Sequence, residues 1–233
     1  MIKTNKKVIT IDGPAASGKT SVGKKVADHF GFLFLDTGLM YRAVTWCALN
    51  EKIPINEEEL VSKLAERIVI DIFPPSKQDG RVNDVIVNNQ DVTWDITRQE
   101  VNNNVSKVSA YAWVRSAMTL HQRRIGNKGD VVMVGRDIGT IVMPNAKWKF
   151  YLEASPEERA RRRYQELLQQ GSIQSYNQIL KSIIERDEMD SSRELAPLKP
   201  ADDAIIIRTD QKTLDEVVMI IINSIENEED KYV

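Results

Sequence analysis

Short apolar runs alternate with amphipathic stretches along most of the chain. Runs this short, rich in Val, Ile, Leu and Phe, are typical of strands that are buried on both faces. The stretches between them carry apolar residues at helical spacing, as Val22, Val26 and Phe30 do. Strands that alternate with helices predict an α/β fold with a doubly wound, five-stranded parallel sheet. The five predicted strands are Val8–Ile11, Phe32–Leu35, Val131–Val134, Trp148–Leu152 and Ala204–Ile207.

Helices are predicted between these strands from the apolar spacing and from residues that favour helix ends. Asn56 stands where an N-cap would begin one helix, and Ser155 stands in the same position before Pro156. Gly171 is expected to end the helix that follows Pro156. The predicted helices cover residues 21–30, 39–50, 57–67, 97–108, 110–125, 156–170, 175–189 and 213–225.

The strand–helix alternation is interrupted in the middle of the chain. Residues 68–73 and 81–87 have the pattern of strands and are joined by a loop with two prolines and a glycine. A small antiparallel unit followed by two helices is therefore expected there. We divide the chain into a core at residues 1–66, an inserted nucleotide-binding subdomain at 67–125, and a continuation of the core at 126–233.

A glycine-containing turn follows directly on the first predicted strand. Residues 13–20 match the phosphate-loop pattern G-x-x-x-x-G-K-[ST], and they lie between a strand and a helix, which is the context that this pattern requires. The glycines let backbone N–H groups approach phosphate oxygens, and the helix dipole adds positive potential. Lys19 is expected to reach the β and γ phosphates, and Thr20 to ligate Mg²⁺. The sequence thus predicts that ATP is bound by Gly13, Pro14, Ala15, Ala16, Ser17, Gly18, Lys19 and Thr20.

Composition and charge exclude several classes of protein. The chain of 233 residues is 42% apolar and 28% charged, as ordinary globular proteins are, and its formal net charge of −2 argues against a general nucleic-acid binder. The single cysteine, Cys47, cannot form an internal disulfide, and two histidines are too few for a zinc site. No apolar run reaches the roughly 20 residues of a membrane span, and the first residues lack a signal-peptide core. We expect a cytoplasmic protein that contacts no membrane.

Arginines are concentrated between residues 159 and 193. A phosphate acceptor is already largely ionised at neutral pH, so its phosphorylation needs cations more than a strong base. Arginine is suited to this because its planar guanidinium binds phosphate bidentately. Three interpretations of the group stay open: a mobile lid over the phosphates, a solvated helix face paired with Glu157 and Glu158, and an RNA patch, which no aromatic pattern supports.

Several motifs resemble those of the bacterial cytidylate kinases, a branch of the nucleoside monophosphate kinases. The most specific are Asp-Thr-Gly-Leu-Met-Tyr-Arg at 36–42 and Gly-Arg-Asp-Ile-Gly-Thr at 135–140, and further matches lie at 11–20, 158–163 and 185–193. They follow the family's order and spacing over nearly the whole chain. The resemblance implies a phosphate-loop kinase that transfers the γ-phosphate of ATP, with Mg²⁺, to CMP and dCMP, and that carries a helical lid at about 156–195.

The resemblance also implies a role for each residue that matches a motif. Arg162 would lie in the lid on the donor side, and Arg193 near the transferring phosphate. Ser106 and Arg115 are placed by alignment across the less distinctive middle of the chain. The implied roles are acceptor-phosphate binding by Thr37, Arg42 and Arg136; substrate binding by Tyr41; base recognition by Ser106, Arg115 and Asp137; sugar contacts by Arg186 and Asp190; and catalysis by Lys19, Arg136, Arg162 and Arg193.

Hydrogen-bond chemistry agrees with the implied recognition of cytosine. The N4 amino group of cytosine donates to a carboxylate such as Asp137, and its N3 and O2 accept from a guanidinium such as Arg115. Uracil reverses the first two groups, so the same pair would leave buried polar atoms without partners, which costs binding energy. The simpler interpretations are that Asp137 is a helix cap or pairs with Arg136, and that Arg115 is a surface charge.

The chain departs from the family's pattern at one position that bears on the metal. Val134 stands where the family usually has Asp, and the nearest candidate to hold a metal-bound water is then Asp36. Alternatives to the kinase hypothesis are a phosphate-loop kinase of another small acceptor such as UMP, a nucleotide-dependent switch, and a non-catalytic nucleotide-binding paralogue. We expect a monomer that binds small nucleotides and no nucleic acid.

Overall fold

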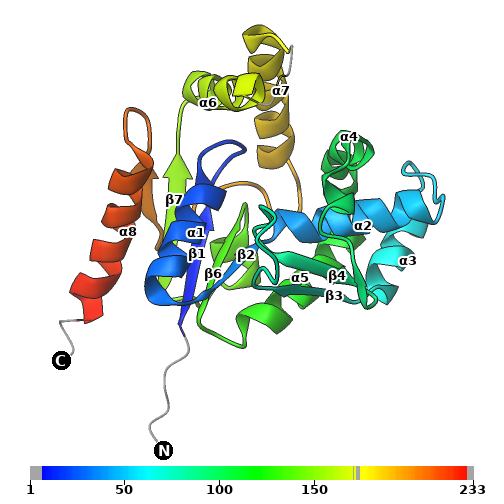
Figure 1. The fold of residues 1–233 in the computed structure, drawn as a ribbon, viewed down its shortest axis with the longest axis horizontal. Coiled ribbons are helices and arrows are strands. Elements are labelled where there is room, and N and C mark those ends of the chain that lie inside the picture. The colour runs from blue at the N-terminus through cyan, green and yellow to red at the C-terminus, as the bar shows by residue number, and fades with distance from the viewer. Residues whose placement is uncertain (1–6, 170, 172–173, 230–233) are drawn as a thin grey trace, which may run out of the picture. The chain divides into compact units, whose positions relative to one another are not determined.

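A computed structural model describes residues 7–169, 171 and 174–229 of the chain. Its larger sheet has five strands in the order β2–β6–β1–β7–β8, and its smaller sheet has three in the order β3–β4–β5 (Figure 1). The predicted α/β fold with a five-stranded parallel sheet is confirmed. The bounds of the five strands are β1 (Val8–Asp12), β2 (Leu33–Asp36), β6 (Val131–Gly135), β7 (Trp148–Glu153) and β8 (Ile205–Arg208), each within one residue of its predicted position.

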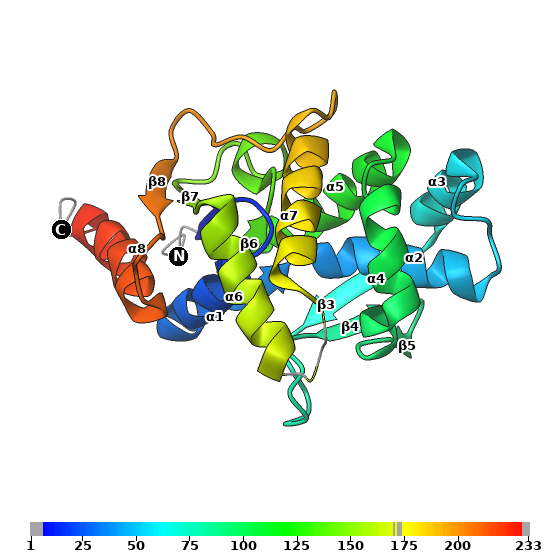
Figure 2. The same ribbon diagram turned by 90° about the horizontal axis from the view of Figure 1, so that it is seen from above.

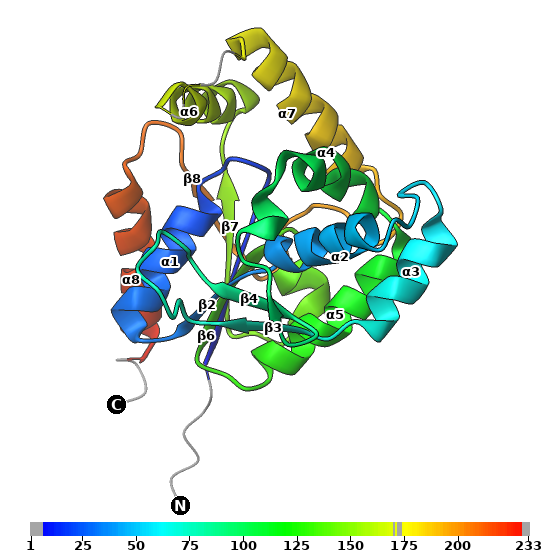
Figure 3. The ribbon, with the colours of Figure 1, turned by 45° about the vertical axis from the view of Figure 1, so that its right-hand side comes forward.

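Two compact units make up the chain, one from the residues up to Phe32 together with Val132 onwards, the other Leu33–Val131. The second unit is larger than the predicted insertion at 67–125. It takes in helices before residue 67 because these pack on helices after it, α2 (Gly38–Asn50) on α4 (Gln99–Val108) and α3 (Glu58–Arg67) on α5 (Ala112–Gly126) (Figure 3). Nucleotide binding by residues 67–125 stays a prediction.

The first unit is built on parallel pairing along its central strands. β1 pairs with β7 and β7 with β8, in a register that sets Ile11 opposite Phe150 and Phe150 opposite Ile205. Helix α1 (Lys19–Phe30) lies beside α8 (Leu214–Glu229), and α6 (Pro156–Gln169) beside α7 (Tyr176–Ser191) (Figure 2). A short π-helical turn, η2 (Ile138–Val142), packs against β1.

Helices α6 and α7 share a small apolar core of their own. Ala160 of α6 is fully buried against Ile179 and Ile183 of α7, with aromatic rings at the rim. The side chain of Ser155 accepts the amide of Glu158 at 3.2 Å, as predicted for the start of α6. Helix α7 begins with a capping box between Ser175 and Gln178, which satisfies two of the amides that a helix start leaves open.

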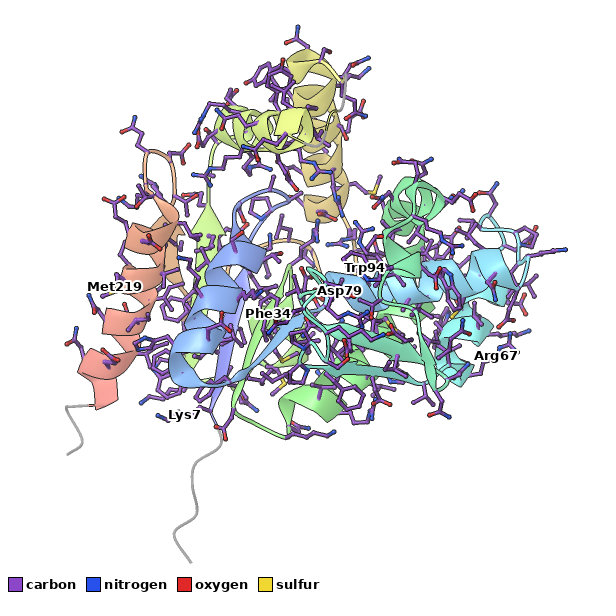
Figure 4. The ribbon with its side chains drawn as sticks, viewed as in Figure 1. Lys7, Phe34, Arg67, Asp79, Trp94 and Met219 are labelled. Atoms are coloured by element: carbon purple, nitrogen blue, oxygen red, sulfur yellow. The ribbon has the colours of Figure 1, made fainter. Side chains whose placement is uncertain are left out.

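The second unit contains the antiparallel strands β3 (Ile70–Phe73), β4 (Asp84–Val87) and β5 (Gln90–Asp91), followed by a short 3₁₀ turn, Asp95–Thr97. Beside them the guanidinium of Arg81 is buried among three carboxylates, those of Asp79, Asp84 and Asp91. The indole N–H of Trp94 donates to Asp79 Oδ2 at 3.1 Å, and Figure 4 labels this pair. Ion pairing with Arg81 lowers the pKa of Asp79.

Three details of the predicted elements are wrong. Asn56 does not cap a helix: α3 begins at Glu58, and the side chain of Asn56 accepts from Lys107 instead. The predicted strand at 81–87 begins only at Asp84, because Arg81 enters its carboxylate cluster. The last strand is not fully buried: Ile205 and Ile206 are 43% and 54% exposed, since β8 lies at an edge of the sheet.

The turn after β1 is constrained by the backbone of β7. Gly13 has φ of 151°, and a Cβ there would lie 2.4 Å from the carbonyl oxygen of Leu152. Gly31, which ends α1 with φ of 67°, has nothing within 4 Å of such a Cβ. An alanine at position 31 would therefore meet backbone strain alone, whereas an alanine at position 13 would also collide with the backbone of β7.

We expect Gly31→Ala to cost about 1 kcal/mol of unfolding free energy, the usual penalty for a left-handed alanine. Gly13→Ala should cost clearly more, because the β7 backbone must move to admit the new methyl group. Urea unfolding followed by circular dichroism measures both values. Equal losses for the two variants would show that the contact with Leu152 does not constrain the turn.

Candidate functional site

The predicted phosphate loop is the connection between β1 and α1. Its backbone turns through left-handed conformations at Ala16 (φ 58°) and Gly18 (φ 93°). The ammonium group of Lys19 folds back over the loop and donates to the carbonyl of Pro14 at 2.5 Å and to Ser17 Oγ at 3.3 Å. Gly18 is the N-cap of α1 and provides no side-chain cap, so the helix presents its first amides to the loop. This geometry suits an anion at the helix start.

Arg159 connects this loop to helices α6 and α7. Its side chain is 3% exposed and forms a bidentate ion pair with Asp187, with N–O distances of 2.9 and 2.5 Å. The same guanidinium donates to the carbonyl of Ala154 at 3.0 Å and to that of Ala15, in the loop, at 3.3 Å. Arg159 is therefore an anchor within the first unit. Sequence reasoning missed this role, since nothing marks a pair that is 28 residues apart.

The other arginines of α6 pair mainly along their own helix. Arg161 and Arg162 both bind Glu158, as the solvated-face interpretation expects. Arg162 also reaches the segment after β8, where it donates to Thr209 Oγ1 at 3.1 Å and to its carbonyl at 2.6 Å. Arg163 pairs with Glu166. Arg162 is thus the member of this group that turns toward another element of the unit.

Asp190 brings together two arginines that come from separate motifs. Its carboxylate, 7% exposed, pairs with Arg136, which follows β6, and with Arg193, which follows α7, the latter at 3.4 Å. The Nε atom of Arg193 also donates to the backbone carbonyl of Asp190 at 3.2 Å. Arg136, Asp190 and Arg193 were each predicted for the site, and the structure gathers them in one cluster. Arg186 lies half-buried on the same helix as Asp190.

A buried carboxylate lies at the end of β1, immediately before the phosphate loop. Asp12 accepts the backbone N–H of Ile138 at 2.9 Å and that of Gly139 at 2.7 Å, just after Asp137. Burial raises the pKa of Asp12 to about 7, although the two amides and Lys19 act in the opposite direction. Sequence analysis assigned this residue no role. The available signal was an acid at the end of a buried strand whose other residues are apolar except for Thr10.

The remaining predicted residues belong to the unit Leu33–Val131. Thr37 is buried at the N-cap of α2, and Asp36 Oδ1 accepts the amide of Gly38 at 2.9 Å. Arg42 binds the side chain of Asn102 and the carbonyl of Ile96, so it lies against α4. Ser106 is half-buried on that helix.

Arg115 and Tyr41 are in direct contact within the same unit. The guanidinium carbon of Arg115 lies 5.4 Å from the centre of the Tyr41 ring, and Nη1 donates to the carbonyl of Ser109 at 3.1 Å. Arg115 is 6% exposed, so the surface-charge interpretation of this residue is wrong. A guanidinium that is buried over an aromatic ring and bonded to a carbonyl is held in a fixed orientation.

Metal ligands are sparse. In residues 7–169, 171 and 174–229, no three His, Cys, Asp or Glu side chains gather as a metal site. Thr20 is exposed at the start of α1, while Val134 is buried in β6 and has no side-chain oxygen. Helices long and apolar enough to cross a membrane are likewise absent from the part of the chain that the structure describes.

Comparison with known proteins places these features in one family. Residues 9–227 match the family model described as Cytidylate kinase. The chain belongs to the cytidylate kinase family. A cytidylate kinase from Desulforamulus reducens is 47% identical over 96% of this chain and 98% of its own length. That of Bacillus subtilis is 43% identical over 94% of this chain and 96% of its own length.

A solved structure supports the fold separately from the sequence. An uncharacterized protein from Eubacterium ventriosum superposes with a TM-score of 0.52 at 14% identity, over 96% of this chain and 99% of that one. At this identity the likeness concerns the fold alone. The family assignment rests on the sequence match.

Replacement of Arg159 should weaken the fold and the phosphate loop together. Arg159→Met leaves Asp187 without its counter-charge and the Ala15 carbonyl without a donor, and we expect a loss of about 3 kcal/mol of unfolding free energy. Arg163→Met removes only a pair on the helix surface and is the matched control, with little expected change. Urea unfolding of both variants tests this expectation. A similar stability of the two would contradict the anchor role.

Proposed function

We propose that this member of the cytidylate kinase family transfers the γ-phosphate of ATP to CMP and dCMP. The observation that carries the proposal is the phosphate loop at 13–20, in which the Lys19 ammonium folds over a loop that leads into the start of α1, in a chain that matches the family over residues 9–227. Loops of this kind bind the β and γ phosphates of a nucleoside triphosphate. The family name supplies the acceptor, a cytidine monophosphate.

The donor phosphates would be held by the loop residues 13–20. Lys19 would exchange its contacts with Pro14 and Ser17 for phosphate oxygens. Mg²⁺ in kinases commonly takes one or two protein oxygens together with substrate phosphates and water. The Thr20 hydroxyl fits this requirement, so the residues present suit a metal that arrives with the nucleotide. Asp36 would orient a metal-bound water, and Arg162 would contact the donor from the lid.

On the acceptor side, Thr37, Arg42 and Arg136 would hold the phosphate of CMP, and Tyr41 would contribute to substrate binding. Ser106, Arg115 and Asp137 would read the base, and Arg186 and Asp190 would contact the sugar. The burial of Arg115 and Asp137, 6% and 5% exposed, supports the assignment to the base. A buried polar group that uracil leaves unsatisfied discriminates strongly against it.

The proposal also covers domain closure, cellular compartment and oligomeric state. Helices α6 and α7, within 156–195, would act as a lid that brings arginines to the phosphates, and residues 67–125 would close on the acceptor. We also propose that the protein is a cytoplasmic monomer.

The first prediction concerns which nucleoside monophosphate the protein phosphorylates. With ATP and Mg²⁺, CMP and dCMP should each support rapid ADP release, while UMP and AMP should support it far more weakly. A coupled ADP-release assay compares the four acceptors at equal concentration. Comparable turnover with UMP would contradict base reading by Arg115 and Asp137. ADP release that no monophosphate stimulates would instead favour a nucleotide-dependent switch.

The arginines around Asp190 should matter chiefly for turnover, and because each also pairs with that buried carboxylate, its replacement should lower stability as well. We expect Arg136→Ala and Arg193→Ala each to lower kcat by about 10³- to 10⁵-fold, the range for a guanidinium that stabilises a transferring phosphoryl group. Arg208→Ala, at an 85% exposed side chain outside the site, is the control and should retain activity. Thermal unfolding checks that each variant is folded. Near-normal turnover in both test variants would overturn their catalytic role.

A further inference from the structure

The side chain of Asp12 ties the strand that precedes the phosphate loop to the turn that carries Arg136 and Asp137. Its two carboxylate oxygens accept the amides of Ile138 and Gly139 separately, at 2.9 and 2.7 Å. These amides are in the first turn of η2 and have no helical partner of their own. Asp12 is 4% exposed, so water does not replace the contact.

The packing around this contact leaves the turn little freedom. A Cβ at Gly139 would lie 3.1 Å from Thr10 Oγ1 and 3.3 Å from Asp12 Oδ2. The same position is 3.3 Å from Cδ of Lys149, on β7. Glycine at position 139 therefore permits the close approach of η2 to β1. The carboxylate of Asp12 then fixes the position and orientation of the turn relative to β1.

We propose that Asp12 is a positioning residue, which holds the turn at 135–139 so that Arg136 and Asp137 point correctly toward the acceptor nucleotide. The inference rests on the proposed function, because it assigns Arg136 and Asp137 to the acceptor. Both carboxylate oxygens of Asp12 are taken up by backbone amides, so its role would be exerted through the turn. Its own backbone is held in the sheet opposite Tyr151, so a change of its side chain releases the turn while the phosphate loop stays anchored.

Ionisation of Asp12 gives this role a pH signature. Only the carboxylate accepts both amides at full strength, and burial raises its pKa to about 7. The charged or titratable groups that face it are Asp137, Lys19 and Tyr151. Acceptor-dependent activity that relies on the ionised form is lost as the pH falls through about 7. The stability contribution has the opposite sign, since a raised folded-state pKa favours the fold at low pH and less as the pH rises.

Asp12→Asn tests the role, because the amide keeps the shape and one acceptor but turns an N–H₂ toward the second backbone N–H. Loss of a charge-assisted hydrogen bond predicts a rise in KM for CMP, or a fall in kcat/KM for CMP, of about 10- to 100-fold, with KM for ATP little changed. Asp203→Asn, which removes an exposed carboxylate paired with Lys149, is the matched control and should leave both KM values unchanged.

The pH profile of kcat/KM for CMP is the second measurement. In the wild type, kcat/KM for CMP should fall as the pH drops below about 7, and this fall should be absent from Asp12→Asn. Any pH dependence that the two proteins share belongs to the substrate or to other groups. An equal rise of both KM values, or identical pH profiles, would overturn the positioning role. A profile in which activity follows stability with pH would also overturn it, because the two should move in opposite directions.

Gly139→Ala perturbs the same contact from the other side and covers the case in which Asp12→Asn does not fold. It should raise KM for CMP and spare KM for ATP; the reverse pattern would count against the proposal. The proposed function is tested apart from this inference by wild-type turnover with CMP. An inactive wild-type protein would refute the kinase assignment, while an active one with insensitive variants would refute only the role of Asp12.

Discussion

The close approach of the Gly13 backbone to the carbonyl of Leu152 constrains the whole phosphate loop. Parallel pairing of β1 with β7 sets these two backbones side by side, and the turn leaves β1 where a side chain would collide with β7. The loop can therefore curl over the start of α1 only with glycine at this position. Everything that we assign to donor binding, from the Lys19 ammonium to the amides of α1, depends on this turn.

Ion pairs then fix the parts of the first unit that carry the arginines. Arg159 holds a loop carbonyl and Asp187 of α7 at once, so the predicted lid is attached to the loop through a buried guanidinium. The carboxylate of Asp190 likewise pairs with both Arg136 and Arg193. In both clusters the arginines form ion pairs with a carboxylate of α7. These arginines are thus oriented by protein carboxylates.

Much of the fold and part of the site could be predicted from sequence, for physical reasons. Buried strands have short apolar runs, so all five strands of the large sheet were located, and the phosphate loop has its own signature. Partners that are distant in sequence leave no such mark: the pairs Arg159–Asp187 and Asp12–Ile138 depend on tertiary packing. The failed cap at Asn56 has the same origin, since Lys107 competes for that side chain.

The shared carboxylate of Asp190 has a consequence for how the site responds to salt. If Arg136 and Arg193 bind phosphate as proposed, the phosphate takes the place of an internal carboxylate, whereas a phosphate that binds exposed arginines displaces mobile counter-ions from solution. Because few free ions are released, affinity for the acceptor should fall with ionic strength less steeply than the number of arginines suggests. A titration of nucleotide binding at increasing salt would report that slope. The site gains selectivity for ligands that match its geometry, since bulk anions gain little by entering it.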